Sequence, residues 1–133
     1  MGPSTTFTSW GSRQSTAIFN RPIALGPKDG SRFQRVIAAV SPENSYTVMP
    51  SPLLEMLGIE PEWTDVLKAP DGGQEEYSLA EVRVRIDDRE RTTVCVFGKA
   101  DGPPILGKYT LDGFGLAVDE ANRRLVPARL FLD

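Results

Sequence analysis

The clearest pattern in this chain is the alternation of apolar and charged residues over residues 77–86. Val82, Val84 and Ile86 fall on one face, and charged residues occupy the positions between them. This period of two predicts a half-buried β-strand whose charged face is a solvated surface. After a charged turn, residues 91–97 return as the second strand of a hairpin.

Shorter segments of β-like composition occur along the rest of the chain, separated by turn residues at intervals of roughly ten residues. They predict strands at residues 17–25, 32–40, 46–50, 62–69, 116–119 and 124–127. Pro22 interrupts the first of these and favours an edge position, since proline lacks the backbone donor that a central strand needs. Many short strands predict an all-β barrel or sandwich.

Two short helices interrupt the strands. Residues 51–58 combine Ser51, which can cap a helix N-terminus, with Pro52, which suits the first helical position. Gly58 can take the left-handed conformation that ends a helix. A second helical stretch is predicted around residues 109–114.

The length of 133 residues predicts one domain. Residues 1–16 are rich in Ser, Thr and Gly and are predicted to be a flexible arm, with a partner-bound arm as the alternative, and residues 17–133 form the domain. Acidic and basic residues are interspersed and the net charge is −3, so the sequence lacks the clustered basic surface typical of nucleic-acid binding.

Histidine is absent and Cys95 is the single cysteine. This excludes Ser-His and Cys-His nucleophile pairs and most zinc sites, and we expect no metal and no cofactor. Cys95 is predicted to be a small buried apolar residue rather than a nucleophile. The sequence has neither the apolar run of ~20 residues that spans a bilayer nor a secretory signal, so a cytoplasmic protein is expected.

The predicted strand at residues 35–40 runs into Ser41, Pro42, Glu43, Asn44 and Ser45 before the apolar pattern resumes. Three further segments, residues 48–59, 104–111 and 115–127, follow in a characteristic order. Together the segments resemble bacterial single-domain members of the retropepsin-like aspartic protease family, over about residues 18–132. The resemblance implies a closed acid-protease β-barrel with one or two short helices.

In the family that this chain resembles, such a strand runs into Asp-Thr-Gly, and the Asp is catalytic. Here Ser41 stands at the Asp position, Pro42 at the Thr position and Glu43 at the Gly position. Glu43 lies two residues along the chain, a displacement of ~6–7 Å that is too large for a shared carboxylate pair. We therefore assign no catalytic residue, and expect Asn44 to take the left-handed conformation of the missing Gly.

The resemblance assigns roles to three other segments. The flap, a hairpin tip that closes over an extended peptide, corresponds to Ala69, Pro70, Asp71, Gly72 and Gly73, although an ordinary β-turn there stays an open alternative. Ile105, Leu106 and Gly107 are expected to support the 41–45 loop from behind. Leu130, Phe131 and Leu132 are expected to form an interface, or else to fold back on the core.

The sequence favours a non-catalytic retropepsin-like module that acts as a structural or protein-interaction subunit. Its partner would be another protein or a second copy, bound through the C-terminal strand and the N-terminal arm, and an extended peptide is a further candidate. Trp63 and Phe97 are predicted to be core or interface residues. The alternative is an active aspartic endopeptidase that uses a non-standard carboxylate or an Asp supplied by a paralogous partner.

Overall fold

The computed structural model describes residues 18–68 and 71–128. These residues form nine strands and two short helices, in agreement with the all-β prediction. The strands are β1 (Phe19–Pro27), β2 (Gln34–Val40), β3 (Thr47–Pro50), β4 (Trp63–Lys68), β5 (Gln74–Ile86), β6 (Arg89–Gly98), β7 (Ile105–Leu106), β8 (Leu116–Asp119) and β9 (Arg124–Pro127). The helices are α1 (Ser51–Met56) and α2 (Lys108–Gly113).

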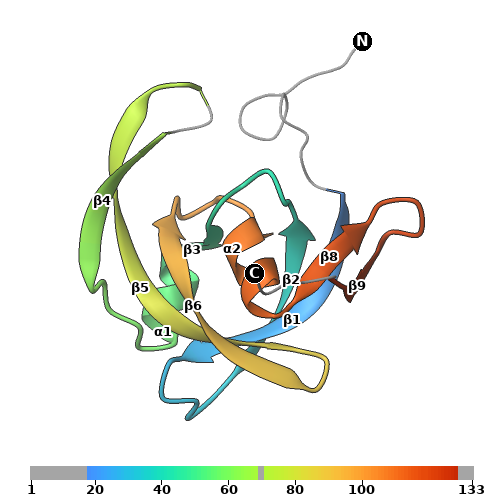
Figure 1. The fold of residues 1–133 in the computed structure, drawn as a ribbon. Helices are drawn as coiled ribbons and strands as arrows, with labels where there is room; N and C mark the ends of the chain where they lie inside the picture. Colours follow the sequence, from blue (N-terminus) through green and yellow to red (C-terminus); the bar gives the residue numbers. More distant parts are fainter. Residues whose placement is uncertain (1–17, 69–70, 129–133) are drawn as a thin grey trace, which may run out of the picture.

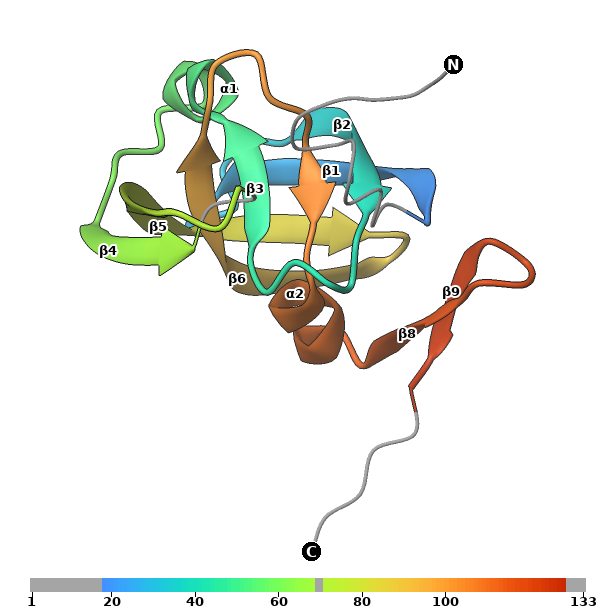
Figure 2. The same ribbon diagram turned by 90° about the horizontal axis from the view of Figure 1, so that it is seen from above.

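Seven strands form one sheet in the order β1-β2-β7-β3-β6-β5-β4. An additional antiparallel pairing of β1 with β5 brings the sheet round into a ring of paired strands, with β4 outside it (Figure 1). The last two strands, β8 and β9, form a separate antiparallel hairpin. Figure 2 shows this hairpin projecting from the ring beyond α2.

Inward-facing aliphatic residues from the strands fill the ring. On β5, Val82, Val84 and Ile86 are buried while Glu81 and Arg85 are exposed, which confirms the alternation predicted from the sequence. Because neighbouring strands contribute residues of the same kind, the ring encloses a single apolar core.

Helix α1 ends as predicted but begins differently. Its last turn is closed by the N–H of Gly58, which donates to Glu55 O, and by the N–H of Ile59, which donates to Leu54 O. Gly58 has φ +77°, the left-handed conformation that this ending requires. The predicted cap by Ser51 is wrong, because the Ser51 hydroxyl donates to Gly98 O at 2.6 Å, on strand β6.

The two aromatic residues predicted for the core or an interface differ in burial. Phe97 is buried in the core, as predicted. Trp63 is 40% exposed on β4, so it does not belong to the core, and its place in an interface stays a prediction. Neither helix of the described residues is long and apolar enough to cross a membrane. The predicted arm at residues 1–16 lies outside the described residues.

Candidate functional site

The loop at residues 41–45 is a tight, hydrogen-bonded turn between β2 and β3. The Asn44 N–H donates to Ser41 O at 3.0 Å, which closes the turn. The Ser41 side chain is 2% exposed, and its hydroxyl donates to the Asn44 side-chain oxygen at 2.6 Å. Asn44 does not take the left-handed conformation that we expected, so its amide group stabilises the turn by accepting this hydrogen bond.

Strand β7 and the start of α2 hold this loop from one side. Leu106 O accepts from the Ser41 N–H at 3.0 Å, and the Lys108 N–H donates to Asn44 O at 2.8 Å. The Tyr109 N–H donates to Ser45 O at 2.9 Å. The structure thus brings together two of the segments that the sequence singled out, residues 41–45 and 105–107.

Gly107 lies where the two backbones come closest. A Cβ atom built on Gly107 would lie 2.3 Å from Tyr46 O and 2.8 Å from Thr47 N. Both are backbone atoms, so no side-chain rotation could relieve the overlap. Any residue larger than glycine would therefore separate α2 from the loop.

A network of threonine hydroxyls, with Thr47 and Thr110 buried and Thr93 partly buried, lies next to this contact. The Thr110 hydroxyl lies 2.7 Å from that of Thr47 and 2.8 Å from that of Thr93. The Thr47 hydroxyl also accepts from the Gly107 N–H at 3.0 Å. This network was not predicted from the sequence, although Thr47 shares the inward face of its strand with Met49 and so could have indicated a buried hydroxyl.

The chemistry available in the loop is limited. Ser41 is buried with its hydroxyl bonded to an amide oxygen, which is not a general base. Glu43, the nearest carboxylate along the chain, is exposed, and Pro42 contributes no backbone donor. Within the part of the chain that the structure describes, no cluster of three or more acidic or sulfur ligands could hold a metal ion.

A second apolar cluster lies on the face of the sheet opposite to the core. Leu79, Val96 and Ile105 are buried but do not belong to the core cluster. The register places Leu79 beside Val96, Val96 beside Val48, Val48 beside Ile105, and Ile105 beside Ala39. This apolar row crosses five strands and ends two residues before Ser41.

The predicted flap corresponds to the hairpin of β4 and β5. In Figure 1 this hairpin rises to the upper part of the view, where the loop between β2 and β3 also lies. Asp71 accepts from the Gly73 N–H at 2.8 Å, and Gly72 has φ +92°. Ala69 and Pro70 lie outside the described residues, as do Leu130, Phe131 and Leu132, so the roles assigned to those residues stay predictions.

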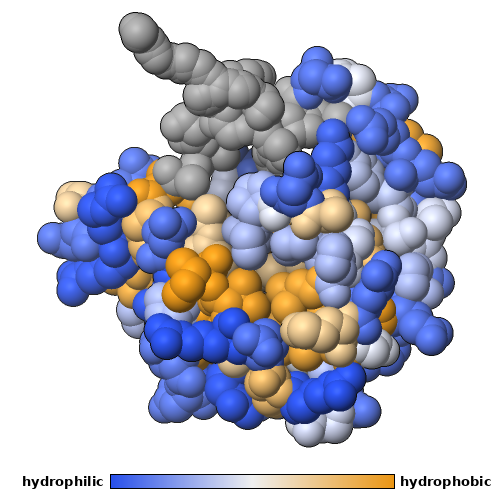
Figure 3. Space-filling view, turned by 180° about the vertical axis from the view of Figure 1, so that it is seen from behind, coloured by the Kyte–Doolittle hydropathy of each residue, from blue (hydrophilic) through white to orange (hydrophobic). Residues whose placement is uncertain are grey.

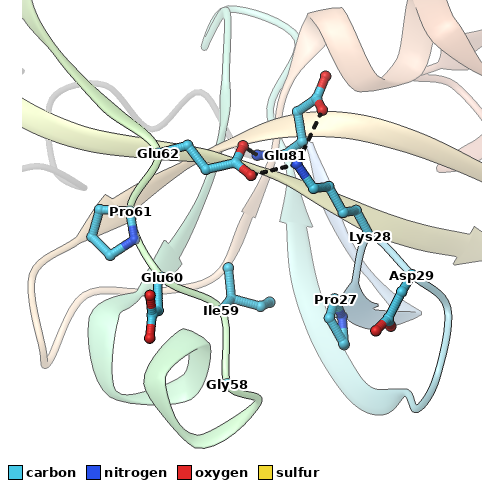
Figure 4. A pocket seen from close by; sticks show the side chains of 9 residues that line it. All are labelled: Pro27, Lys28, Asp29, Gly58, Ile59, Glu60, Pro61, Glu62 and Glu81. Atoms are coloured by element: carbon cyan, nitrogen blue, oxygen red, sulfur yellow. Dashed lines mark hydrogen bonds and ion pairs between the residues drawn. The ribbon is translucent and has the colours of Figure 1, made fainter.

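A surface pocket lies between the β1–β2 turn and the segment after α1 (Figure 4). Lys28 pairs there with the Glu62 carboxylate, and this hydrogen bond lowers the pKa of Glu62 and raises that of Lys28. Glu62 also accepts from the Glu81 N–H at 2.9 Å. These groups satisfy one another, and no residue of the 41–45 loop lines the pocket, so we do not treat it as the functional site.

Cys95 is fully buried in the core, as the sequence predicted, and burial raises the pKa of its thiol to about 12. The thiolate is the reactive form, so a thiol reagent is expected to label the native protein only as fast as the protein unfolds. Labelling followed by mass spectrometry, with and without denaturant, checks this. Rapid labelling of the folded protein would contradict the burial of Cys95.

Comparisons with known proteins support the fold. No family model matches the chain, and no curated protein matches it. Among solved structures, the EIAV protease complexed with the inhibitor HBY-793 matches with a TM-score of 0.57. The match covers 86% of this chain and 92% of that chain, at 14% sequence identity. This likeness, together with the ring of strands and the two short helices, shows that the chain has a retropepsin-like fold.

Proposed function

We propose that this chain is a non-catalytic retropepsin-like module that serves as a structural or protein-interaction subunit. The observation that carries the proposal is the state of Ser41. This residue stands where the resemblance implies a catalytic Asp, and its buried hydroxyl is bonded to Asn44. The loop is therefore packed and hydrogen-bonded without a carboxylate at its centre.

The chemistry of aspartic proteases explains why the residue at position 41 determines whether the chain can be catalytic. Two carboxylates must lie close enough to share one proton, so that one activates water while the other donates a hydrogen bond to the substrate. A serine hydroxyl keeps its proton near neutral pH and needs a base to become a nucleophile. The chain has no histidine, and Glu43, the carboxylate of the 41–45 loop, is exposed to solvent.

Several retained features support a binding role. The apolar row ending at Ala39 lies beside the loop, and the β4–β5 hairpin offers a strand edge that an extended peptide could pair with. Ile37 and Met56 are also exposed, by 52% and 60%. Figure 3 shows apolar side chains gathered near the centre of the face opposite to that of Figure 1.

The partner in this proposal is a second copy or another protein, held through the C-terminal residues 130–132 and the N-terminal arm. The position of the β8–β9 hairpin supports it, because these two strands pair with no other described strand. Leu116 of this hairpin belongs to the core, and Val118 and Leu125 pack against it, so the hairpin offers a partner its unpaired strand edges. A cytoplasmic location is part of the proposal and is supported by the single, buried Cys95.

A substitution at Glu43 tests the alternative that this carboxylate replaces the missing Asp. The wild type and Glu43→Gln are expected to give the same background in a peptidase assay at about pH 4 to about pH 7, because neither has a carboxylate at position 41 from which a pair could form. Glu55→Gln, which changes an exposed carboxylate on α1, is the matched control. Cleavage by the wild type that Glu43→Gln alone removes would contradict the proposal.

A further inference from the structure

Strand β4 has an unpaired edge. Within the described residues it pairs only with β5, and it is the last strand in the sheet order. Every residue of β4 is exposed except Leu67, which is intermediate. A strand with one free edge presents unpaired N–H and C=O groups along its length and can accept another extended chain.

The surroundings of this edge are strongly acidic. Residues 60–76, which include the segment leading into the hairpin, β4 and the start of β5, carry Lys68 and six acidic residues, which are Glu60, Glu62, Asp65, Asp71, Glu75 and Glu76. Only Glu62 makes an ion pair with another described residue. The remaining five acidic residues are exposed, three of them on β4 and β5, so the local field favours a positively charged partner.

The two faces of β4 differ in chemistry. Trp63 and Asp65 are two positions apart and so lie on the same face, with Trp63 40% exposed. A Lys or Arg side chain could contact both the indole ring and the carboxylate. The other face carries Val66, which is 57% exposed and suits an aliphatic neighbour.

We propose that the free edge of β4 binds an extended basic segment of another protein by strand addition. In this segment Lys or Arg would alternate with β-branched or aliphatic residues. The inference rests on the proposed function, because it names the partner chemistry of a module that binds rather than cleaves. It concerns the outer edge of the hairpin and requires neither the 41–45 loop nor the apolar row.

Charge argues against a second copy of the chain as the occupant of this edge. Pairing of two β4 strands would bring two acidic hairpins side by side, and like charges on neighbouring strands are destabilising. The Asp65 carboxylate also accepts a hydrogen bond from the Val66 N–H at 2.9 Å, so this backbone donor of β4 is occupied. A basic partner would attract the carboxylate and so release the N–H for pairing, whereas an acidic partner would not.

A synthetic peptide of alternating arginine and valine, as long as β4, tests the inference. Its binding is measured by calorimetry and by the tryptophan fluorescence of a Trp10→Phe variant. In this variant Trp63 is the only tryptophan, so the fluorescence reports on β4. We expect binding that the Glu75→Gln/Glu76→Gln variant weakens about threefold to tenfold, as the loss of two surface charges should. Raising the salt concentration from about 0.1 M to about 1 M should weaken it too. Glu120→Gln, on the distant β8–β9 turn, should bind like the wild type.

Two further probes separate strand addition from general charge attraction. The same peptide with alternate backbone amides N-methylated keeps its charge but loses the donors of one edge, so it should not bind. Val66→Lys, which places a cation in the middle of the strand, should abolish binding of the unmodified peptide. Equal binding of the methylated peptide, or no binding of the unmodified one, would overturn the inference.

The same samples distinguish the other outcomes. Self-association of the protein alone that Val66→Lys removes, seen by sedimentation, would assign the edge to a second copy and overturn the basic partner. Mass spectrometry of the peptide after incubation reports on the proposed function separately. Cleavage would contradict the non-catalytic module, whereas an intact, unbound peptide would contradict only the inference about β4.

Discussion

Gly107→Ala is expected to destabilise this protein strongly. The added methyl group would lie 2.3 Å from Tyr46 O and 2.8 Å from Thr47 N, which are both backbone atoms. To relieve this overlap α2 must move away from the loop, which breaks the hydrogen bond from the Gly107 N–H to the Thr47 hydroxyl. We expect a loss of about 3 to 5 kcal/mol in the free energy of unfolding.

Denaturant unfolding followed by circular dichroism measures this loss. Gly113→Ala is the matched control, because a Cβ atom at Gly113 meets nothing within 4 Å and the residue also lies on α2. Its stability should change by no more than about 1 kcal/mol. Equal stability of the two variants would mean that the close approach between Gly107 and Tyr46 does not exist.

Ser41→Asp is expected to destabilise the protein strongly at neutral pH, even though it places the catalytic residue type of the resembled family at this position. Ser41 is 2% exposed, and its own N–H already donates to Leu106 O. Burial at this position removes most of the hydration of a carboxylate, so we expect a loss of about 2 to 4 kcal/mol in the free energy of unfolding at about pH 7.

The loss should depend on pH in a defined direction. Burial raises the pKa of the introduced carboxyl group in the folded state above its unfolded value of about 3.9. The folded state then binds the proton more tightly, so the destabilisation is smallest near pH 4 and grows as the pH rises. Ser45→Asp, at an exposed position of the same loop, is the control and should show little change. A Ser41→Asp variant as stable as the wild type at neutral pH would contradict the packing described for the loop.

Local patterns sufficed to predict much of the fold. The sequence predicted β8 and β9 with the observed bounds, because each is a short apolar run on either side of a polar turn. It also predicted the alternation on β5 and the glycine ending of α1. Each depends on residues adjacent in the chain, and the periods of strands and turns report such local relations directly.

Hydrogen bonds to residues distant in the sequence were predicted wrongly or were not predicted. Ser51 looks like a helix cap in sequence, yet Gly98 of β6, 47 positions away, accepts its hydroxyl. The hydroxyl network that links Thr47 to Thr110 spans 63 positions, so the local pattern indicates at most that Thr47 faces inward and does not identify its partner. Asn44 was expected to replace a glycine by its backbone conformation, whereas its side chain accepts from Ser41.

The features of the candidate site also differ in whether the sequence alone reveals them. The absence of an Asp at position 41 is visible in the sequence. The apolar row from Leu79 to Ala39 is not, because it exists only through the register of five strands. The unpaired edge of β4 also required the sheet order, since an edge strand and a central strand can share one composition.

The most direct test of the non-catalytic assignment is mass spectrometry of a peptide library incubated with the purified wild-type protein at about pH 4 to about pH 7, with and without a statine-type inhibitor. Two carboxylates sharing a proton are required for aspartic protease chemistry in this range, and Ser41 supplies none. We predict no cleavage that the inhibitor suppresses. Cleavage by the protein alone that the inhibitor abolishes would contradict the assignment.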